Sequence, residues 1–480
     1  MVFNSIHYLF FISVVFVLYF LLPAKQRWKL LLAASVYFYC TFDIKFLVLI
    51  AFSIFTSFFL AIKSEETADE SKKKLFLHLA IWSSALILAV FKYYNFFAES
   101  GTELFASMGI AVSPLLIKIG LPIGLSFYTF QIIGYSLDVY YGVSKAERKL
   151  GIYSLYILFF PKLIAGPIEQ SQNLLPQLHK EQNFDYNRIT SGIKLIAWGL
   201  FKKVCIADRL SVFVDMVFSS PEQYSGLQSI IACYFLVFMV YTDFSGYTDM
   251  AVGAARIFGF NLIRNFNRPF ISQNLTEFWK RWHISLYTWC YEYIYNPLSF
   301  NYRNWKQWGI ILAIFATLTF SGLWHGAALT FIIYGVLHAI GLTAEYFLSP
   351  FRAKMKSTLP SLFYKYVSIA ITFHFFLFTL IIFKSDTLSE AFYIIESFTK
   401  INISQFGLYL FGDYKIEFLL SFVFVFALLG MEYWQSKTDN YLSFHLKLPS
   451  FVRWSAYALM ILIVVYFGVI KSNEFVYAQF

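Results

Sequence analysis

The stretch Ser321-Gly322-Leu323-Trp324-His325-Gly326 lies inside an apolar run from Ile310 to Leu348. An ionisable side chain is costly to place within a membrane span, so this histidine is a candidate functional residue. The flanking glycines let backbone or substrate approach closely, and Trp324 adds a large flat wall. Histidine also suits proton transfer near neutral pH. The alternative interpretation, a histidine that only hydrogen-bonds to a neighbouring helix, stays open.

The composition of the chain indicates a polytopic membrane protein. Of its 480 residues, 59% are hydrophobic and 14% are charged, whereas a soluble domain is nearer a quarter charged. The net charge of +10 fits cytoplasmic loops rich in Lys and Arg, and nothing resembles a basic domain that binds nucleic acid. The cysteines lie in apolar contexts without a CxxC pair, so we interpret them as buried side chains: Cys40, Cys205, Cys233 and Cys290.

Apolar runs of about 17 to 25 residues predict membrane-spanning helices. We place spans near residues 5–22, 28–42, 46–62, 75–97, 308–322, 327–348, 363–384, 416–434 and 452–470, with another ending near Tyr140. The Lys and Arg bias of the loops predicts that both termini lie outside the cytoplasm. Pro and Gly predict re-entrant or broken helices around 150–170 and 245–275. The basic, Trp-rich segment 276–300 is too polar to span and is expected at the membrane interface.

Two further groups of residues are candidates for chemistry. Asp243 and Asp249 lie in an apolar region, where carboxylates are costly unless paired. They predict either ion pairs with nearby arginines or direct acid–base chemistry. The ending Phe475-Val476-Tyr477-Ala478-Gln479-Phe480 is either an interfacial aromatic anchor or a tether that presents Tyr477 as a covalent acyl acceptor. No His or Cys spacing indicates a metal site.

Seven motifs follow one another over most of the chain: MVFNS at 1–5, LPIGLSF at 121–127, FPKLIAGPI at 160–168, DFSGYTDM at 243–250, NFNRPF at 265–270, FWKRWHISL at 278–286 and GLWHG at 322–326. Together they resemble the membrane-bound O-acyltransferase (MBOAT) family, in particular its bacterial branch of alginate and peptidoglycan O-acetyltransferase membrane subunits. The fold class implied is an all-α polytopic membrane protein, residues 1–480 forming one transmembrane domain. A ring of about 11 or more transmembrane helices, with re-entrant or interfacial helices, would surround a central tunnel.

The resemblance also implies roles for particular residues. His325 would be the essential histidine inside the tunnel, and His283 a second polar residue on its cytoplasmic side. The donor would be acetyl-CoA, arriving from the cytoplasm as a substrate, with no permanently bound cofactor and no metal. The candidate donor- or substrate-binding residues are Trp324, Trp282, Lys280, Arg281, Asp243 and Asp249. For Lys280 and Arg281, anchoring at the membrane surface remains the alternative role.

The tail 471–480 is similar to a Phe-x-Tyr-x-x-Phe motif that, in the related teichoic-acid D-alanylation system, belongs to a separate small protein and carries the acyl group. Its fusion here implies an acetyltransferase that uses Tyr477 as its own relay. The acetyl group would pass to an extracytoplasmic SGNH-type partner with a Ser-His-Asp site, and from there to a polysaccharide. The implied location is the cytoplasmic (inner) membrane of a bacterium, within the lipid bilayer.

Two departures and two alternatives qualify this prediction. After Trp289 the family usually has an Arg-Asp pair, but Cys290-Tyr291-Glu292-Tyr293 stands here, and the glycine-rich, basic turn usual after Pro297-Leu298 is replaced by residues 299–304. If these positions touch CoA or a partner, the donor contacts or the partner are expected to differ. A transporter or flippase would also suit broken helices and intramembrane charge, although the internal repeats typical of transporters are not found in the sequence. An acyltransferase that uses another acyl-CoA and a lipid or protein acceptor is the second alternative.

Overall fold

The computed structural model describes residues 1–110, 113, 114, 116, 120–224, 226–401, 414–436 and 449–469. These residues form helices and no strands, which confirms the all-α prediction. Within the described ranges, eight helical segments are long and apolar enough to cross a membrane: Ile44–Glu66, Glu70–Ser107, Gly226–Phe258, Gln307–His325, Leu329–Thr358, Ser361–Lys384, Lys415–Ser436 and Ser450–Phe467. The protein is therefore a multi-pass membrane protein.

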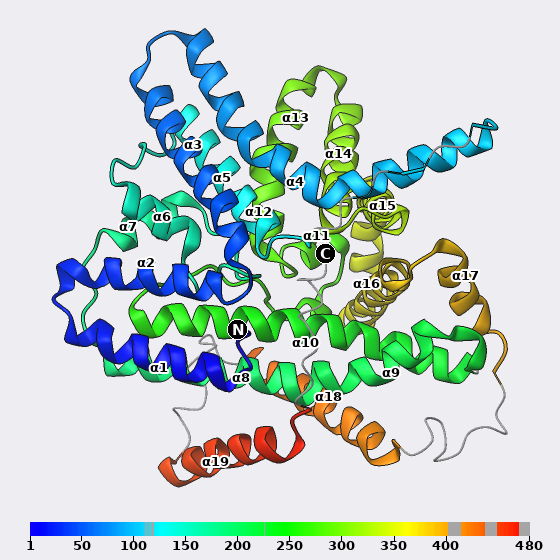
Figure 1. Cartoon of the computed structure of the whole chain (residues 1–480). Coiled ribbons are helices and arrows are strands. Elements are labelled where there is room, and N and C mark those ends of the chain that lie inside the picture. Colours follow the sequence, from blue (N-terminus) through cyan, green and yellow to red (C-terminus); the bar gives the residue numbers. More distant parts are fainter. Residues whose placement is uncertain are drawn as a thin grey trace. The chain divides into compact units, whose positions relative to one another are not determined.

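The chain forms two compact units, one of Met1–Ile193 with Ala251–Ile263 and the other of Lys194–Met250 with Arg264–Phe480. In the first unit α3, α4 and α5 pack side by side, and α2 packs against α6 (Figure 1). The helices of this unit, with the start of α8, are α1 (Ile6–Leu21), α2 (Ala24–Cys40), α3 (Leu47–Glu66), α4 (Glu70–Ser107), α5 (Leu125–Tyr140), α6 (Leu150–Leu158), α7 (Ser171–Leu178) and α8 (Tyr186–Phe201).

The irregular backbone of the first unit follows its Pro and Gly residues. Gly124 caps the start of α5 with a left-handed φ of 72°, and a Cβ there would lie 2.3 Å from the carbonyl oxygen of Leu163. Only glycine therefore fits between α5 and the turns at 159–166. These turns follow the end of α6, as the prediction of a broken helix at 150–170 requires. The break expected at 245–275 starts later, because α10 continues without interruption to Phe258.

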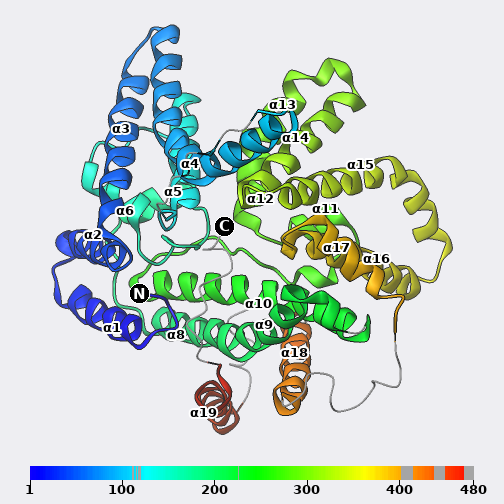
Figure 2. The ribbon, with the colours of Figure 1, turned by 45° about the vertical axis from the view of Figure 1, so that its right-hand side comes forward.

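The second unit holds the C-terminal half of the chain. Figure 2 shows α15 packed between α14 and α16. Its elements are the π-helix η2 (Lys202–Ala207), α9 (Asp208–Ser219), η3 (Pro221–Gln223), most of α10 (Gly226–Phe258), η4 (Pro269–Ile271), α11 (Leu275–Trp279), α12 (Ile284–Cys290), the π-helix η5 (Tyr291–Tyr295), α13 (Asn296–Asn301), η6 (Arg303–Trp305), α14 (Gln307–His325), α15 (Leu329–Thr358), α16 (Ser361–Lys384), α17 (Leu388–Ser397), α18 (Lys415–Ser436) and α19 (Ser450–Phe467).

Two glycines set the crossing of α14 and α15. A Cβ on Gly322 would lie 2.3 Å from the carbonyl oxygen of Phe331, and a Cβ on Gly335 would lie 2.3 Å from that of Leu318. The backbones therefore meet without side chains between them, in the same way as small residues allow close helix packing in membranes. This contact lies one turn before the end of α14 and so fixes the position of His325.

The segment 276–300 buries the tryptophans that were predicted to lie at the membrane interface. It folds into α11, α12, η5 and α13, and its aromatic side chains turn inward. Trp279, Trp282 and Trp289 are only 5%, 2% and 5% exposed, because each ring packs against other aromatic rings of this unit. Tryptophans at an interface keep one edge in contact with headgroups and water, so the interfacial interpretation of these three residues is wrong.

Candidate functional site

His325 is the last residue of α14, and its imidazole lies among aromatic rings from three helices. The centres of the Trp324 and Phe383 rings are 5.0 and 5.2 Å from that of the imidazole, and Tyr334 is at 6.3 Å. Gly326 ends the helix in an extended conformation. A Cβ on Gly326 would lie 2.2 Å from the Phe331 ring, so the helix end fits closely against α15. These contacts leave His325 4% exposed.

His283 is held in a strained turn immediately before α12. Its φ of 45° and ψ of 52° are left-handed, a conformation that is uncommon without glycine and that often marks functional sites. Asn265 maintains the turn, since its carbonyl oxygen accepts from the Ile284 N–H and its side-chain oxygen accepts from the Ser285 N–H. Burial lowers the pKa of His283 to about 3. Its imidazole is therefore neutral at physiological pH.

Trp324 connects the two histidines. Its indole centre is 5.9 Å from the His283 imidazole and 5.0 Å from the His325 imidazole. Phe244 of α10 covers His283 from another direction at 4.6 Å. Trp282, which the sequence also singles out, packs instead against Phe376 and the surrounding rings, so its side chain belongs to the core beneath the turn. The structure thus brings His283, Trp324 and His325 together.

Asp243 and Asp249 lie on α10 and form buried ion pairs. The Asp243 carboxylate is 2.6 Å from the Lys203 Nζ, which also lies 2.8 Å from Asp208. The Asp249 carboxylate is 2.6 Å from the Lys202 Nζ. The sequence predicted ion pairs but named arginines as the partners, and the partners in the structure are lysines. The pairs lock α10 against η2, and α10 in turn presents Phe244 to His283.

The two lysines show what the sequence interpretation missed. Lys202 and Lys203 belong to the excess of Lys and Arg that predicts cytoplasmic loops, yet they are only 2% and 6% exposed. They lie next to each other at the start of the π-helix η2. The wider turn of a π-helix is frequent at functional sites. A pair of lysines flanked by apolar residues, forty positions before a pair of aspartates, is the signal that could have identified these partners.

A second buried polar cluster lies in the first unit. Lys162 donates to the side-chain oxygen of Gln131 and lies over the Tyr156 ring. Glu169 accepts from Asn173 at 2.6 Å and from the backbone N–H of Ile263. Burial lowers the pKa of the Lys162 ammonium and raises that of the Glu169 carboxyl. The FPKLIAGPI motif therefore has at least one structural role, which is to hold the chain after α10 in place.

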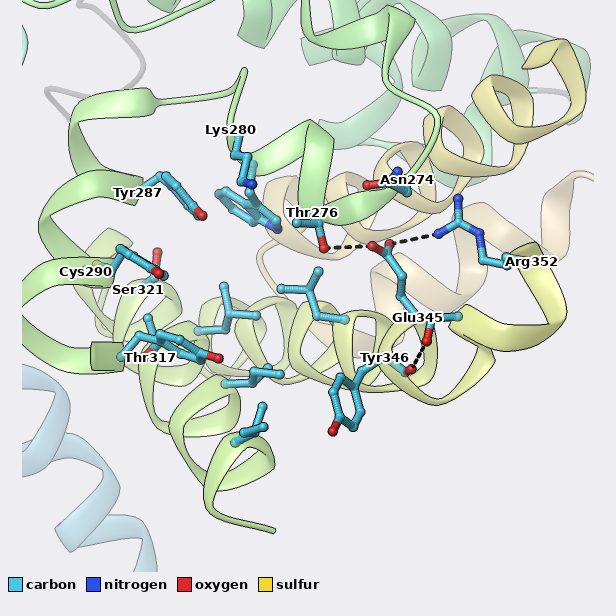
Figure 3. Close-up of a pocket in the computed structure, with 18 of the residues that line it drawn as sticks. Asn274, Thr276, Lys280, Tyr287, Cys290, Thr317, Ser321, Glu345, Tyr346 and Arg352 are labelled. Carbon is cyan, nitrogen blue, oxygen red and sulfur yellow. Dashed lines mark hydrogen bonds and ion pairs between the residues drawn. The ribbon is translucent and has the colours of Figure 1, made fainter. Parts of the chain in front are cut away.

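A cavity of about 950 Å³ opens beside α11, α12, α14 and α15. Figure 3 shows Glu345 and Arg352 at one end, and Tyr287, Cys290 and Ser321 at the other. Apolar side chains such as Ile314 and Leu318 line the wall between these ends. The cavity is of the size and lining typical of small-molecule sites.

Lys280 and Arg281 are neighbours in the chain, but only Lys280 lines the cavity. Lys280 lines the cavity together with Arg352 and Lys356, and these three cations share it with the Glu345 carboxylate. Arg281 pairs with Glu277 at 2.9 Å and donates to the carbonyl oxygen of Asn267. Lys280 is thus placed for an anionic ligand, whereas the contacts of Arg281 support the local turn.

Tyr477 lies outside the residues that the structure describes. Within the described ranges, no group of three or more His, Cys, Asp or Glu side chains could hold a metal ion.

Comparison with known sequences identifies the family of this multi-pass membrane protein. The model of the MBOAT, membrane-bound O-acyltransferase family, matches residues 149–385, which contain His283, His325 and the cavity. The chain belongs to the membrane-bound O-acyltransferase family.

Three similar proteins of known name are bacterial acyltransferases. The chain is 37% identical over 356 residues to "Probable alginate O-acetylase AlgI" of Azotobacter vinelandii, an alignment that covers 72% of this chain and 68% of that protein. It is 32% identical over 434 residues to "Peptidoglycan O-acetyltransferase" of Helicobacter pylori, covering 84% and 80%. It is 30% identical over 272 residues to "Teichoic acid D-alanyltransferase" of Bacillus subtilis, covering 55% and 68%.

Proposed function

We propose that the protein is a membrane O-acetyltransferase that uses cytoplasmic acetyl-CoA to acetylate a hydroxyl outside the cytoplasm, for O-acetylation of an exported or cell-wall polysaccharide. The observation that carries the proposal is the position of His325 four residues beyond Ser321 on α14, because Ser321 lines the cavity that contains three cations. The relatives named for alginate and peptidoglycan support acetate as the acyl group and polysaccharide as the final acceptor.

The cavity is proposed as the site of the donor. Its Lys280, Arg352 and Lys356 side chains suit the phosphates of CoA, since guanidinium and ammonium groups form strong charge-assisted hydrogen bonds to phosphate. The apolar wall suits the pantetheine arm, which would point toward Ser321. Four residues of α-helix rise about 6 Å, so a thioester at that end would lie close to His325.

The chemistry follows from this placement. The acceptor hydroxyl attacks the thioester carbonyl as the His325 imidazole takes its proton, a new C–O bond forms, and the C–S bond breaks. The CoA thiolate leaves and receives the proton from the imidazolium. A positioned general base contributes roughly 10²–10⁴-fold to such a step. In this mechanism His283 orients the Trp324 ring by direct contact, and Trp324 in turn packs against His325.

Tyr477 is proposed as the first acceptor. Its phenol has an ordinary pKa of about 10, so it is protonated at neutral pH and needs a base before it can attack. The acetyl-tyrosine would then pass its acetyl group to an SGNH-type partner outside the cytoplasm, whose serine forms an acyl intermediate. In this scheme CoA stays on the cytoplasmic side, and only the acetyl group crosses the membrane.

The test uses the purified full chain, isotope-labelled acetyl-CoA and mass spectrometry of the C-terminal peptide. We expect release of CoA and label on Tyr477 in the wild type, and neither in His325→Ala. His374→Ala is the matched control, because this histidine is exposed on α16 and bonds Tyr234. Near-normal CoA release by His325→Ala would refute His325 as the base. CoA release with the label absent from Tyr477 would refute the relay and leave direct transfer to another acceptor.

A further inference from the structure

Glu345 is a carboxylate placed among the cations of the cavity. It lies on α15, and its side chain is 17% exposed, against 28% for its partner Arg352. The two groups are 3.6 Å apart, from Arg352 Nη1 to Glu345 Oε2. Lys280 and Lys356 line the same cavity, and Lys356 follows Arg352 by four positions on α15, so both project from one face of this helix.

The Glu345 carboxylate accepts two hydrogen bonds and forms one ion pair. One oxygen accepts from the Leu275 N–H at 2.8 Å, and the other accepts from the Thr276 hydroxyl at 2.7 Å. The ion pair is with the Arg352 guanidinium, which also donates to the carbonyl oxygen of Gln273 at 3.0 Å. Figure 3 shows Glu345 between Thr276 and Arg352 at this end of the cavity. Glu345 and the Gln273 carbonyl oxygen together hold the Arg352 guanidinium at this end.

We infer that Glu345 competes with a phosphate group of the thioester donor for Arg352, so that Glu345 sets donor affinity and selects donors that carry phosphate. This inference rests on the proposed function. A phosphate entering this end replaces the carboxylate at the guanidinium, since Arg binds both anions with the same planar set of N–H groups. The carboxylate and the incoming phosphate carry like charges and repel each other. A thioester without phosphate gains nothing from Arg352 and leaves the ion pair intact.

Glu345→Gln separates this role from a structural one. Glutamine keeps an oxygen that accepts from Leu275 and removes the charge that competes for Arg352. We expect the KM for acetyl-CoA to fall by up to about fivefold, the range expected for release of a partly exposed ion pair, with kcat unchanged. The KM for acetyl-pantetheine, which has the same thioester and no phosphate, should not change. Glu396→Gln is the matched control, because Glu396 of α17 forms an exposed ion pair with Lys400, beyond the end of that helix, and is not a cavity residue.

Arg352→Gln tests the same relationship from the other side. The KM for acetyl-CoA should rise and that for acetyl-pantetheine should stay at the wild-type value. The double variant Glu345→Gln/Arg352→Gln should differ from Arg352→Gln by less than Glu345→Gln differs from the wild type, because without the guanidinium only the like-charge repulsion between Glu345 and the phosphate remains. Independent effects that simply add would overturn the inference.

Two further outcomes distinguish failure of the inference from failure of the proposed function. If the wild type consumes acetyl-CoA but Glu345→Gln has an unchanged or raised KM, or an equally lowered KM for acetyl-pantetheine, the inference is wrong and the proposed function stands. If the wild type, supplied with an acceptor, neither binds CoA nor consumes acetyl-CoA, both are wrong together.

Discussion

The indole of Trp324 lies edge-to-face against the imidazole of His283, with the ring centres 5.9 Å apart. One residue belongs to α14 and the other to the turn before α12, so this contact joins two segments that are about forty positions apart in the chain. Trp324 also precedes His325 directly. A displacement of the turn would therefore reach His325 through a single rigid ring.

We expect Trp324→Ala to lower kcat for CoA release by about 10- to 100-fold, because a displacement of about 1 Å in a catalytic group can cost that much. Trp324→Phe should keep most of the contact and lose less. The control is Trp308→Ala, which removes an exposed tryptophan from the same helix. Equal rates for Trp324→Ala and Trp308→Ala would show that the indole does not position His325.

The pKa of His283 predicts how stability depends on pH. Burial lowers this pKa from 6.5 to about 3, so the unfolded chain takes up a proton below pH 6.5 that the folded protein refuses. The free energy of unfolding should therefore fall as the pH drops from 6.5 toward 3, by up to about 1.4 kcal/mol per pH unit, and should not respond to this group above 6.5. Melting curves in detergent between pH 5 and 8 measure this dependence.

In His283→Gln the dependence should be weaker than in the wild type, since glutamine does not titrate. His374→Gln, which replaces the exposed histidine of α16, should retain the wild-type dependence. The same slope in His283→Gln and the wild type would contradict a buried neutral imidazole.

The ion pair between Lys202 and Asp249 makes a prediction about folding. Asp249→Asn leaves the Lys202 ammonium buried without its carboxylate, and removing one partner of a buried pair typically costs about 3–5 kcal/mol. Lys202→Met/Asp249→Asn should be less destabilised than the sum of the single variants, because no unpaired charge remains. Glu396→Gln, at an exposed pair, should change stability by less than about 1 kcal/mol. Strictly additive losses in melting experiments would argue against the pair.

The cavity can be tested by filling it. Ser321 lines the cavity and is 6% exposed, so Ser321→Phe puts an aromatic ring where the thioester is proposed to lie. We expect acetyl-CoA consumption to fall by at least about tenfold with little loss of stability, since the ring enters existing space. Ser321→Ala removes only a hydroxyl and should remain active. Full activity in Ser321→Phe would exclude this end of the cavity as the donor site.

Much of the fold could be predicted from the sequence, because a long run of consecutive apolar residues is enough to indicate a membrane-spanning helix. The predicted spans 308–322, 363–384 and 416–434 correspond to α14, α16 and α18. The prediction was wrong where burial depends on the tertiary structure. Trp282 has the flanking cations of an interfacial residue, yet it packs inside a cluster of rings. Local composition cannot distinguish a tryptophan that faces lipid headgroups from one that faces another helix.

In the candidate site, too, residues with a local sequence signal could be predicted, whereas contacts between distant segments could not. His325 could be identified because an intramembrane histidine is rare and costly. The left-handed backbone of His283 could not, since it depends on Asn265 eighteen positions away. Nor could the link between Thr276 and Glu345, which are separated by 69 residues. The aspartates of α10 predicted that ion pairs exist, but the lysine partners required the π-helix that turns both side chains inward.

The crossing at Gly322 and Gly335 has a mechanical consequence. Backbones in direct contact cannot slide past one another without collision. We therefore expect α14 and α15 to move as one rigid pair of helices, with His325 at the end of α14. The other side of the cavity consists of the short helices α11 and α12, and the strained turn at His283 lies just before α12. We therefore expect any motion that opens the cavity to occur on that side, while His325 keeps its place at the end of α14.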